Sequence, residues 1–213
     1  MNLDDIIIDT GYFFLILNTL VFILSYTKKD KVLRCFIMYL VLCIIVQLYS
    51  SYLSSLNSNN LFLSHYFFIG QFIFLSLFFS TLHNFKELKN FIRFLILPIA
   101  LYFMIHLYNS PESYKKFNPI EIAVTSIPLL MYSFYFFIKK IDDHKDKKYI
   151  YFNSGFFVYT LCSTLIFILG NMGFRELKLH LWDINAFLYL VFQIMVFVEW
   201  YKNFKKTLRL KER

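Results

Sequence analysis

Residues 61–82 read LFLSHYFFIGQFIFLSLFFSTL, a run of 22 residues without one Asp, Glu, Lys or Arg. An α-helix rises about 1.5 Å per residue, so roughly 20 apolar residues cross the hydrocarbon core of a bilayer. Polar segments bound the run, with SSLNSNN before it and HNFKELKN after it. This stretch therefore predicts a transmembrane helix.

Working outward from this run, six further apolar stretches have a similar length. The chain is 58% hydrophobic and only 17% charged, whereas a soluble domain carries about 25% charged residues. We therefore predict an all-α, polytopic membrane protein with seven transmembrane helices in residues 1–201 and a basic cytoplasmic tail in residues 202–213. The other predicted spans are 6–26, 33–53, 91–108, 119–138, 149–170 and 181–201.

The basic residues alternate from one connection to the next. Eighteen of the 22 Lys and Arg fall in the first, third and fifth connections and in the tail. The other connections hold four, and none precedes the first span. Because short cytoplasmic loops are enriched in Lys and Arg, this pattern places the N-terminus outside and the C-terminus in the cytoplasm. Lipid is then the first expected partner.

Six of the polar residues inside the predicted spans are candidates for a polar core, because unpaired polar groups are costly there. The amides have interhelical hydrogen bonding as their ordinary use, and a polar core or narrow pore as the alternative. Glu199 and Asn153 fall at similar depth near the cytoplasmic side and could bond, whereas Glu199 could instead reach the interface or pair with Lys202. The candidates for the polar core or pore are Asn18, Gln47, Gln71, Asn153, Gln193 and Glu199.

A second candidate site lies at the outer ends of the third and seventh predicted spans. His65, Asp183 and Asn185 could form an outer pocket for a small ligand or a metal. Capping of the seventh helix is a simpler account of Asp183.

The C-terminal residues read KNFKKTLRLKER and hold six basic residues in twelve. A cationic tail anchors topology and attracts anionic lipid. Alternatively, the tail docks an acidic partner. The residues proposed for lipid or partner docking are Lys202, Lys205, Lys206, Arg209 and Lys211.

The sequence has no GxSxG, P-loop or GxGxxG motif, and its three cysteines show no metal-binding spacing. We therefore expect neither enzymatic activity nor a cofactor.

Three aromatic and aliphatic stretches carry a resemblance to known proteins. They read NSNNLFLSHYFFIGQFIFLSLFF (57–79), YFNSGFFVYTLCSTLIFIL (151–169) and LWDINAFLYLVFQIMVFVEW (181–200). They resemble small multi-pass proteins of the Bacteroidetes lineage, and within these the transmembrane accessory proteins of type VI-B CRISPR loci. The broader group is expected to carry an acid in the third helix, where this chain has Gln71.

The resemblance implies a protein of the bacterial inner membrane that modulates RNA-targeting CRISPR interference, for example by altering membrane permeability. A cytoplasmic RNA-guided nuclease complex would then be a partner, and a pore would need a homo-oligomer. Two alternatives from other classes stay open. One is a seven-helix sensor or ligand-binding module that signals to a cytoplasmic partner, and the other is a small transporter.

Overall fold

The structure, a computed structural model, describes residues 3–27, 30–82, 89–109, 117–142, 147–169 and 175–205. These residues form seven helices and no strand. Each helix is long and apolar enough to cross a bilayer, which confirms the predicted number of spans. The helices are α1 (Leu3–Ser25), α2 (Lys31–Ser55), α3 (Phe62–Thr81), α4 (Lys89–Asn109), α5 (Pro119–Asp142), α6 (Ile150–Leu169) and α7 (Arg175–Asn203).

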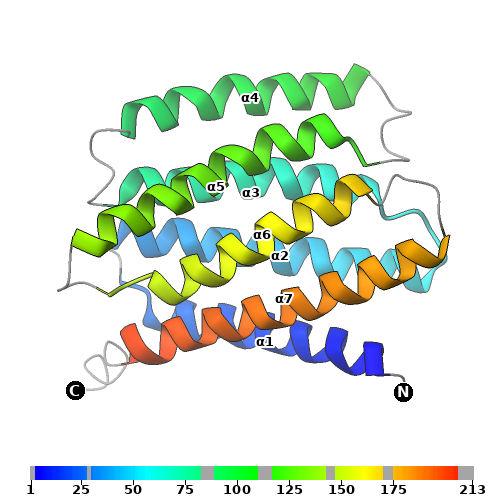
Figure 1. The fold of residues 1–213 in the computed structure, drawn as a ribbon, viewed down its shortest axis with the longest axis horizontal. Coiled ribbons are helices and arrows are strands. Elements are labelled where there is room, and N and C mark those ends of the chain that lie inside the picture. The colour runs from blue at the N-terminus through cyan, green and yellow to red at the C-terminus, as the bar shows by residue number, and fades with distance from the viewer. Residues whose placement is uncertain are drawn as a thin grey trace.

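The helices lie side by side along the long axis of the molecule (Figure 1). Six of them form a closed ring in which α1 contacts α2, α2 contacts α3, α3 contacts α5, α5 contacts α6, α6 contacts α7, and α7 returns to α1. Helix α4 lies outside this ring, packs against α3, and contacts α5 over a short stretch. The start of α1 and the end of α7 lie at opposite ends of the bundle, as an odd number of traverses requires (Figure 1).

Positive charge gathers at one end of the bundle, where α1, α3, α5 and α7 end. We call it the basic end and the other the opposite end. All ten Lys and Arg whose side chains the structure describes lie at the basic end: Lys31, Arg34, Lys89, Arg93, Lys139, Lys140, Lys147, Lys148, Lys202 and Lys205. Lys206, Arg209 and Lys211 of the predicted docking tail lie outside the described residues.

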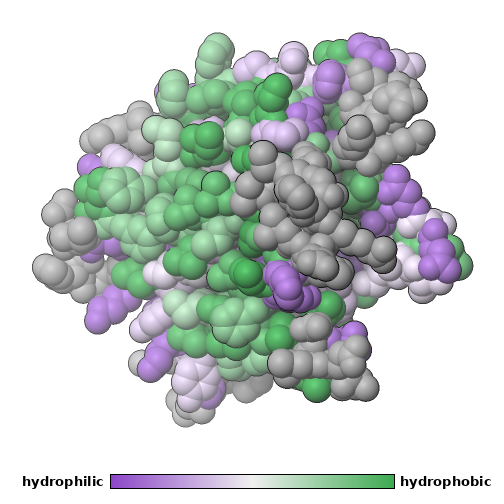
Figure 2. Space-filling model, turned by 45° about the vertical axis from the view of Figure 1, so that its right-hand side comes forward, coloured by the Kyte–Doolittle hydropathy of each residue, from purple (hydrophilic) through white to green (hydrophobic). Residues whose placement is uncertain are grey.

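The outer surface of the bundle is apolar along the helices. Phe94 of α4 is 78% exposed, Met131 of α5 65% and Phe13 of α1 62%. Figure 2 shows hydrophobic side chains covering much of one face of the molecule, with hydrophilic ones nearer its margins. Water does not tolerate so many contiguous large apolar side chains, whereas lipid chains do. The chain is therefore an α-helical membrane protein.

Toward the basic end, stacked and edge-to-face aromatic side chains fill the space enclosed by the six helices. The Phe36 ring centroid lies 4.6 Å from that of Phe152 and 4.9 Å from that of Phe22, both edge to face. Each such pair contributes about 0.5–1.5 kcal/mol beyond the burial of its area. We define the aromatic cluster as the buried rings of Phe22, Phe36, Phe78, Phe79, Tyr149, Phe152, Phe156 and Phe204.

Candidate functional site

A partly open cavity of about 530 Å³ lies inside the ring, between α1, α2, α3, α6 and α7. Its rim includes Asn60 and Leu61 of the connection between α2 and α3, so the cavity lies at the opposite end of the bundle. It reaches inward to Cys43 and Tyr159, which sit near the middle of α2 and α6. Its volume falls in the range of sites that bind drug-sized molecules, about 300–1,000 Å³.

Aromatic side chains form much of the cavity wall. The Phe167 ring centroid lies 5.2 Å from that of Phe117 and 5.4 Å from that of Trp182. The Phe68 ring meets Phe167 edge to face at 5.2 Å. These contacts join α3, the residues before α5, the end of α6 and the start of α7. The aromatic residues that line the cavity are Tyr12, Phe67, Phe68, Phe117, Tyr159, Phe167, Trp182 and Tyr189.

The polar part of the wall consists of amides and hydroxyls. The Gln47 Nε2 donates a hydrogen bond to the Tyr12 hydroxyl, and Asn60 Nδ2 donates one to Ser50 Oγ at 2.8 Å. The Oδ1 of Asn185 is buried and has no hydrogen-bond partner among the described residues. Within that same part of the chain, no charged side chain lines the cavity. From the described residues, a bound molecule would therefore meet hydrogen-bonding groups and aromatic rings and no formal charge.

The three residues of the predicted outer pocket have different surroundings in the structure. Asn185 lines the cavity, whereas His65 and Asp183 do not. Asp183 is exposed on α7, and His65 is buried against α5. Among the described residues, no group of three His, Cys, Asp or Glu is placed to hold a metal ion.

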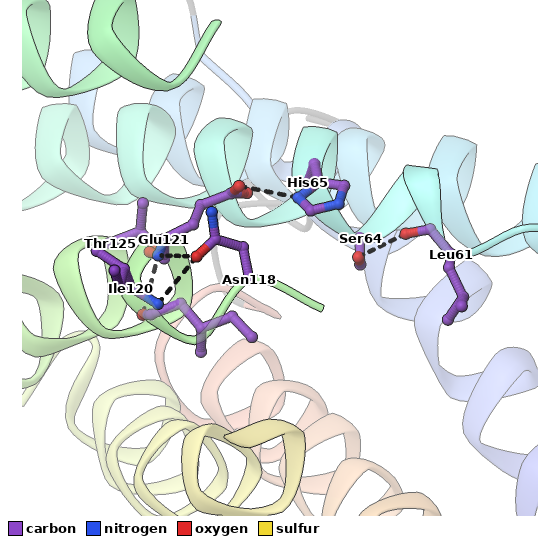
Figure 3. A network of polar contacts seen from close by, with 8 residues as sticks. Leu61, Ser64, His65, Asn118, Ile120, Glu121 and Thr125 are labelled. Carbon is purple, nitrogen blue, oxygen red and sulfur yellow. Dashed lines mark hydrogen bonds and ion pairs between the residues drawn. The ribbon is translucent and has the colours of Figure 1, made fainter. Parts of the chain in front are cut away.

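His65 is paired with a residue that the sequence analysis did not single out. Its Nδ1 lies 2.8 Å from Glu121 Oε2, and the two side chains are 1% and 0% exposed. Figure 3 shows the imidazole on α3 pointing toward the carboxylate on α5. Asn118 Oδ1 accepts hydrogen bonds from the backbone N–H of Ile120 and Glu121, which fixes the first turn of α5. The sequence signal for Glu121 is an acid with apolar residues on both sides, at the start of a predicted span.

The hydrogen bonds that the structure describes for the residues of the predicted polar core do not join them into one network. Asn18 on α1 pairs with Gln193 on α7, since its Nδ2 donates to Gln193 Oε1 at 3.0 Å and to the Gln193 carbonyl at 2.9 Å. Gln47 lines the cavity, while Gln71 is buried in α3. Asn153 bonds to Ser133 of α5 through both ends of its amide.

Glu199 has a structural partner set of its own, and neither Asn153 nor Lys202 belongs to it. The fully buried Glu199 carboxylate accepts hydrogen bonds from the backbone N–H of Tyr149 at 2.6 Å and of Tyr151 at 3.0 Å. The N–H of Phe152 lies 3.4 Å from the same carboxylate, and Asn203 Nδ2 donates at 2.8 Å. A side chain of α7 therefore caps the N-terminus of α6, where the unpaired backbone N–H groups favour an anion.

The Asn18–Gln193 pair gives a first prediction. Asn18→Leu should lower the free energy of unfolding by about 0.6–2 kcal/mol, because Gln193 Oε1 loses its donor. The double variant Asn18→Leu with Gln193→Leu should lose less than the two single changes together, since no polar side chain is then left unpaired. Unfolding in mixed micelles of increasing SDS content, followed by circular dichroism, measures all four proteins. Strict additivity would contradict the pairing.

Comparison with models of protein families, with curated proteins and with solved structures finds no match to this chain. The fold and the cavity therefore define the class: a seven-helix membrane protein with a central cavity at one end. The role in type VI-B CRISPR interference stays a prediction from the sequence resemblance.

Proposed function

We propose that this protein is a membrane ligand-binding module that takes a small uncharged molecule into the cavity and signals to the cytoplasmic side. The observation that carries the proposal is the cavity wall, which combines aromatic rings, amides and hydroxyls and, among the described residues, no charge. Such walls bind molecules with a flat apolar body and a few hydrogen-bonding groups. The unpartnered Asn185 Oδ1 calls for a hydroxyl or N–H donor on that molecule.

The distribution of charge supports the orientation that this function needs. Cytoplasmic loops carry the excess of Lys and Arg, so the basic end faces the cytoplasm in this proposal. The cavity then opens on the outer surface of a bacterial inner membrane. A ligand would enter from outside, and the cationic end would meet the cytoplasmic partner.

Helix α7 connects the two ends. It places Trp182, Asn185 and Tyr189 in the cavity wall, bonds α1 through Gln193, and caps α6 through Glu199. A shift of α7 on ligand binding would therefore be felt at the start of α6, at the basic end. This continuity supports signalling through α7, since packed helices move as rigid elements.

The chain offers its own reporter for the test. It has two tryptophans, and Trp182 lines the cavity while Trp200 donates to Ser25 Oγ near the basic end. Trp200→Phe therefore leaves Trp182 as the single tryptophan. In lipid nanodiscs, uncharged phenyl glycosides and short-chain quinones should change Trp182 fluorescence with saturation. Charged phenyl carboxylates and phenylamines of equal size should not.

Asn185→Leu should weaken binding of the best uncharged probe about two- to tenfold, because a buried hydrogen bond contributes about 0.5–1.5 kcal/mol. Asp183→Asn, an exposed position two residues away on α7, is the matched control and should bind as the parent does. Binding of the charged probes alone, or an unchanged affinity in Asn185→Leu, would contradict the proposal.

A further inference from the structure

The pair of His65 and Glu121 joins α3 to α5 about one helical turn inside the opposite end. His65 is the fourth residue of α3, and Glu121 is the third residue of α5. Both side chains are buried, and the contact between them is 2.8 Å. A buried ionisable pair costs desolvation energy and adds little net stability compared with apolar residues of the same size. Its presence therefore calls for a role besides holding two helices together.

The carboxylate is only half satisfied. Oε2 faces the imidazole, whereas Oε1 is buried and has no hydrogen-bond partner among the described residues. An unpaired carboxylate oxygen in an apolar place is an acceptor that a proton satisfies. Protonation of Oε1 turns the carboxylate into a neutral acid, and the ion pair with the imidazole is lost.

We propose that His65 and Glu121 form a proton-binding site that loosens the joint between α3 and α5 when Glu121 Oε1 takes up a proton. The proton comes from the aqueous phase at the opposite end of the bundle. In the closed joint the pair shares one proton, which leaves it without net charge. A second proton gives imidazolium beside a neutral acid, and this buried net charge favours an opened, hydrated joint.

Among the described residues, the titratable groups on the helices packed around this pair can be named. The helices packed on α3 and α5 are α2, α4 and α6, and their described residues at this end include no Asp, Glu, Lys or Arg. Their titratable side chains there are Tyr49 and Tyr52 of α2, Tyr102, His106 and Tyr108 of α4, and Tyr159 and Cys162 of α6. His106 is the histidine among them, so it is replaced as a control in the test below.

The joint is continuous with the cavity wall. Ser64 precedes His65 in the sequence and lines the cavity, as does Phe68 one turn further along α3. Phe117 lies one turn before Glu121, and its ring centroid is 5.8 Å from that of Trp182. Movement of α3 against α5 therefore reaches Trp182 through Phe117. Control of ligand access by the proton is the consequence for binding, and this last step rests on the proposed function.

The test uses the Trp200→Phe protein in lipid nanodiscs, without any ligand. Its Trp182 emission should change with pH in a single step. Glu121→Gln and His65→Gln should each abolish this titration. The matched controls are Asp183→Asn and His180→Gln, which remove groups close to Trp182 in the sequence, and His106→Gln, which removes the histidine of α4. Each control should keep the pH dependence of the Trp182 emission.

Infrared difference spectra between acidic and neutral buffer give a second, direct measurement. The parent protein should gain a carboxylic-acid carbonyl band that Glu121→Gln removes and Glu121→Asp shifts, which keeps the test decisive where one substitution impairs folding. Persistence of the Trp182 titration in Glu121→Gln, or the absence of the band, would overturn the proton site. Both outcomes are independent of the phenyl glycoside and quinone measurements, so failure of ligand binding leaves this result standing.

Discussion

Glu199→Ala should destabilise the folded bundle by roughly 3–5 kcal/mol, the largest loss that we expect from one polar side chain. The substitution removes the acceptor from the backbone N–H groups of Tyr149 and Tyr151, and from the nearby N–H of Phe152. Tyr149 has a positive φ of 66°, a conformation that few residues other than glycine adopt. The carboxylate holds this turn, so its loss also releases the residue that precedes α6.

Unfolding by SDS, followed by circular dichroism, measures the effect. Glu199→Gln keeps one acceptor oxygen and should fall between alanine and the parent. Lys202→Gln is the matched control, because Lys202 is exposed on the same helix and has no part in the cap. A Glu199→Ala protein within about 1 kcal/mol of the parent would show that the cap contributes no more than an ordinary hydrogen bond.

Gly155→Val should separate α6 from α7 and lower the free energy of unfolding by about 3 kcal/mol or more. A Cβ at Gly155 would lie 2.8 Å from Met195 Cβ and 3.2 Å from Phe192 Cδ2. Met195 Cβ is attached directly to the backbone of α7, so no rotamer change can relieve the clash and the helices must move apart. Gly155→Ala should cost about 1–3 kcal/mol, the usual penalty for overpacking a core.

Gly70→Ala is the matched comparison on α3. A Cβ there would lie 2.6 Å from Leu42 Cδ2, which is a closer contact but at the far end of a flexible side chain. Leu42 can rotate away, so Gly70→Ala should cost less than Gly155→Ala despite the shorter distance. The same SDS unfolding measures both variants. If Gly70→Ala is the more damaging of the two, the distinction between movable and fixed neighbours does not hold here.

The sequence predicts the spans well because bilayer thickness and hydropathy set them. Residues 61–82 become α3 with bounds Phe62–Thr81, and the other spans agree to within a few residues at most ends. The largest difference is the start of α7, at Arg175 rather than residue 181. The segment from Arg175 onward carries charged residues, which a hydropathy window rejects although the helix continues through them.

The partners of the polar residues were beyond the reach of the sequence. Asn18 and Gln193 lie 175 positions apart, and nothing in either span selects the other. Glu199 and Asn153 do lie near the same end of the bundle, as predicted, yet Glu199 binds backbone N–H groups and Asn153 binds Ser133. Backbone donors are present at every helix start, so composition cannot mark the one that a distant carboxylate caps.

Glu121 was missed for a related reason. An acid in the first turn of a helix ordinarily interacts with the helix dipole at the surface, and its neighbours in sequence, Ile120 and Ile122, do not reveal a partner. Only the packing of α3 on α5 brings His65 to it. The sequence predicts how deep each residue lies in the membrane. Which neighbouring helix a side chain faces depends on how the helices pack, and the sequence alone does not show this.

The described cavity stops at mid-depth, and the aromatic cluster fills the ring beyond it. In this conformation, a ligand that enters through the open mouth of the cavity has to leave through the same mouth. In the proposed binding module, the occupancy of the cavity would follow the ligand concentration on the side of the open mouth. Under the proposed function, such a bundle would respond to the composition of the medium on one side of the membrane.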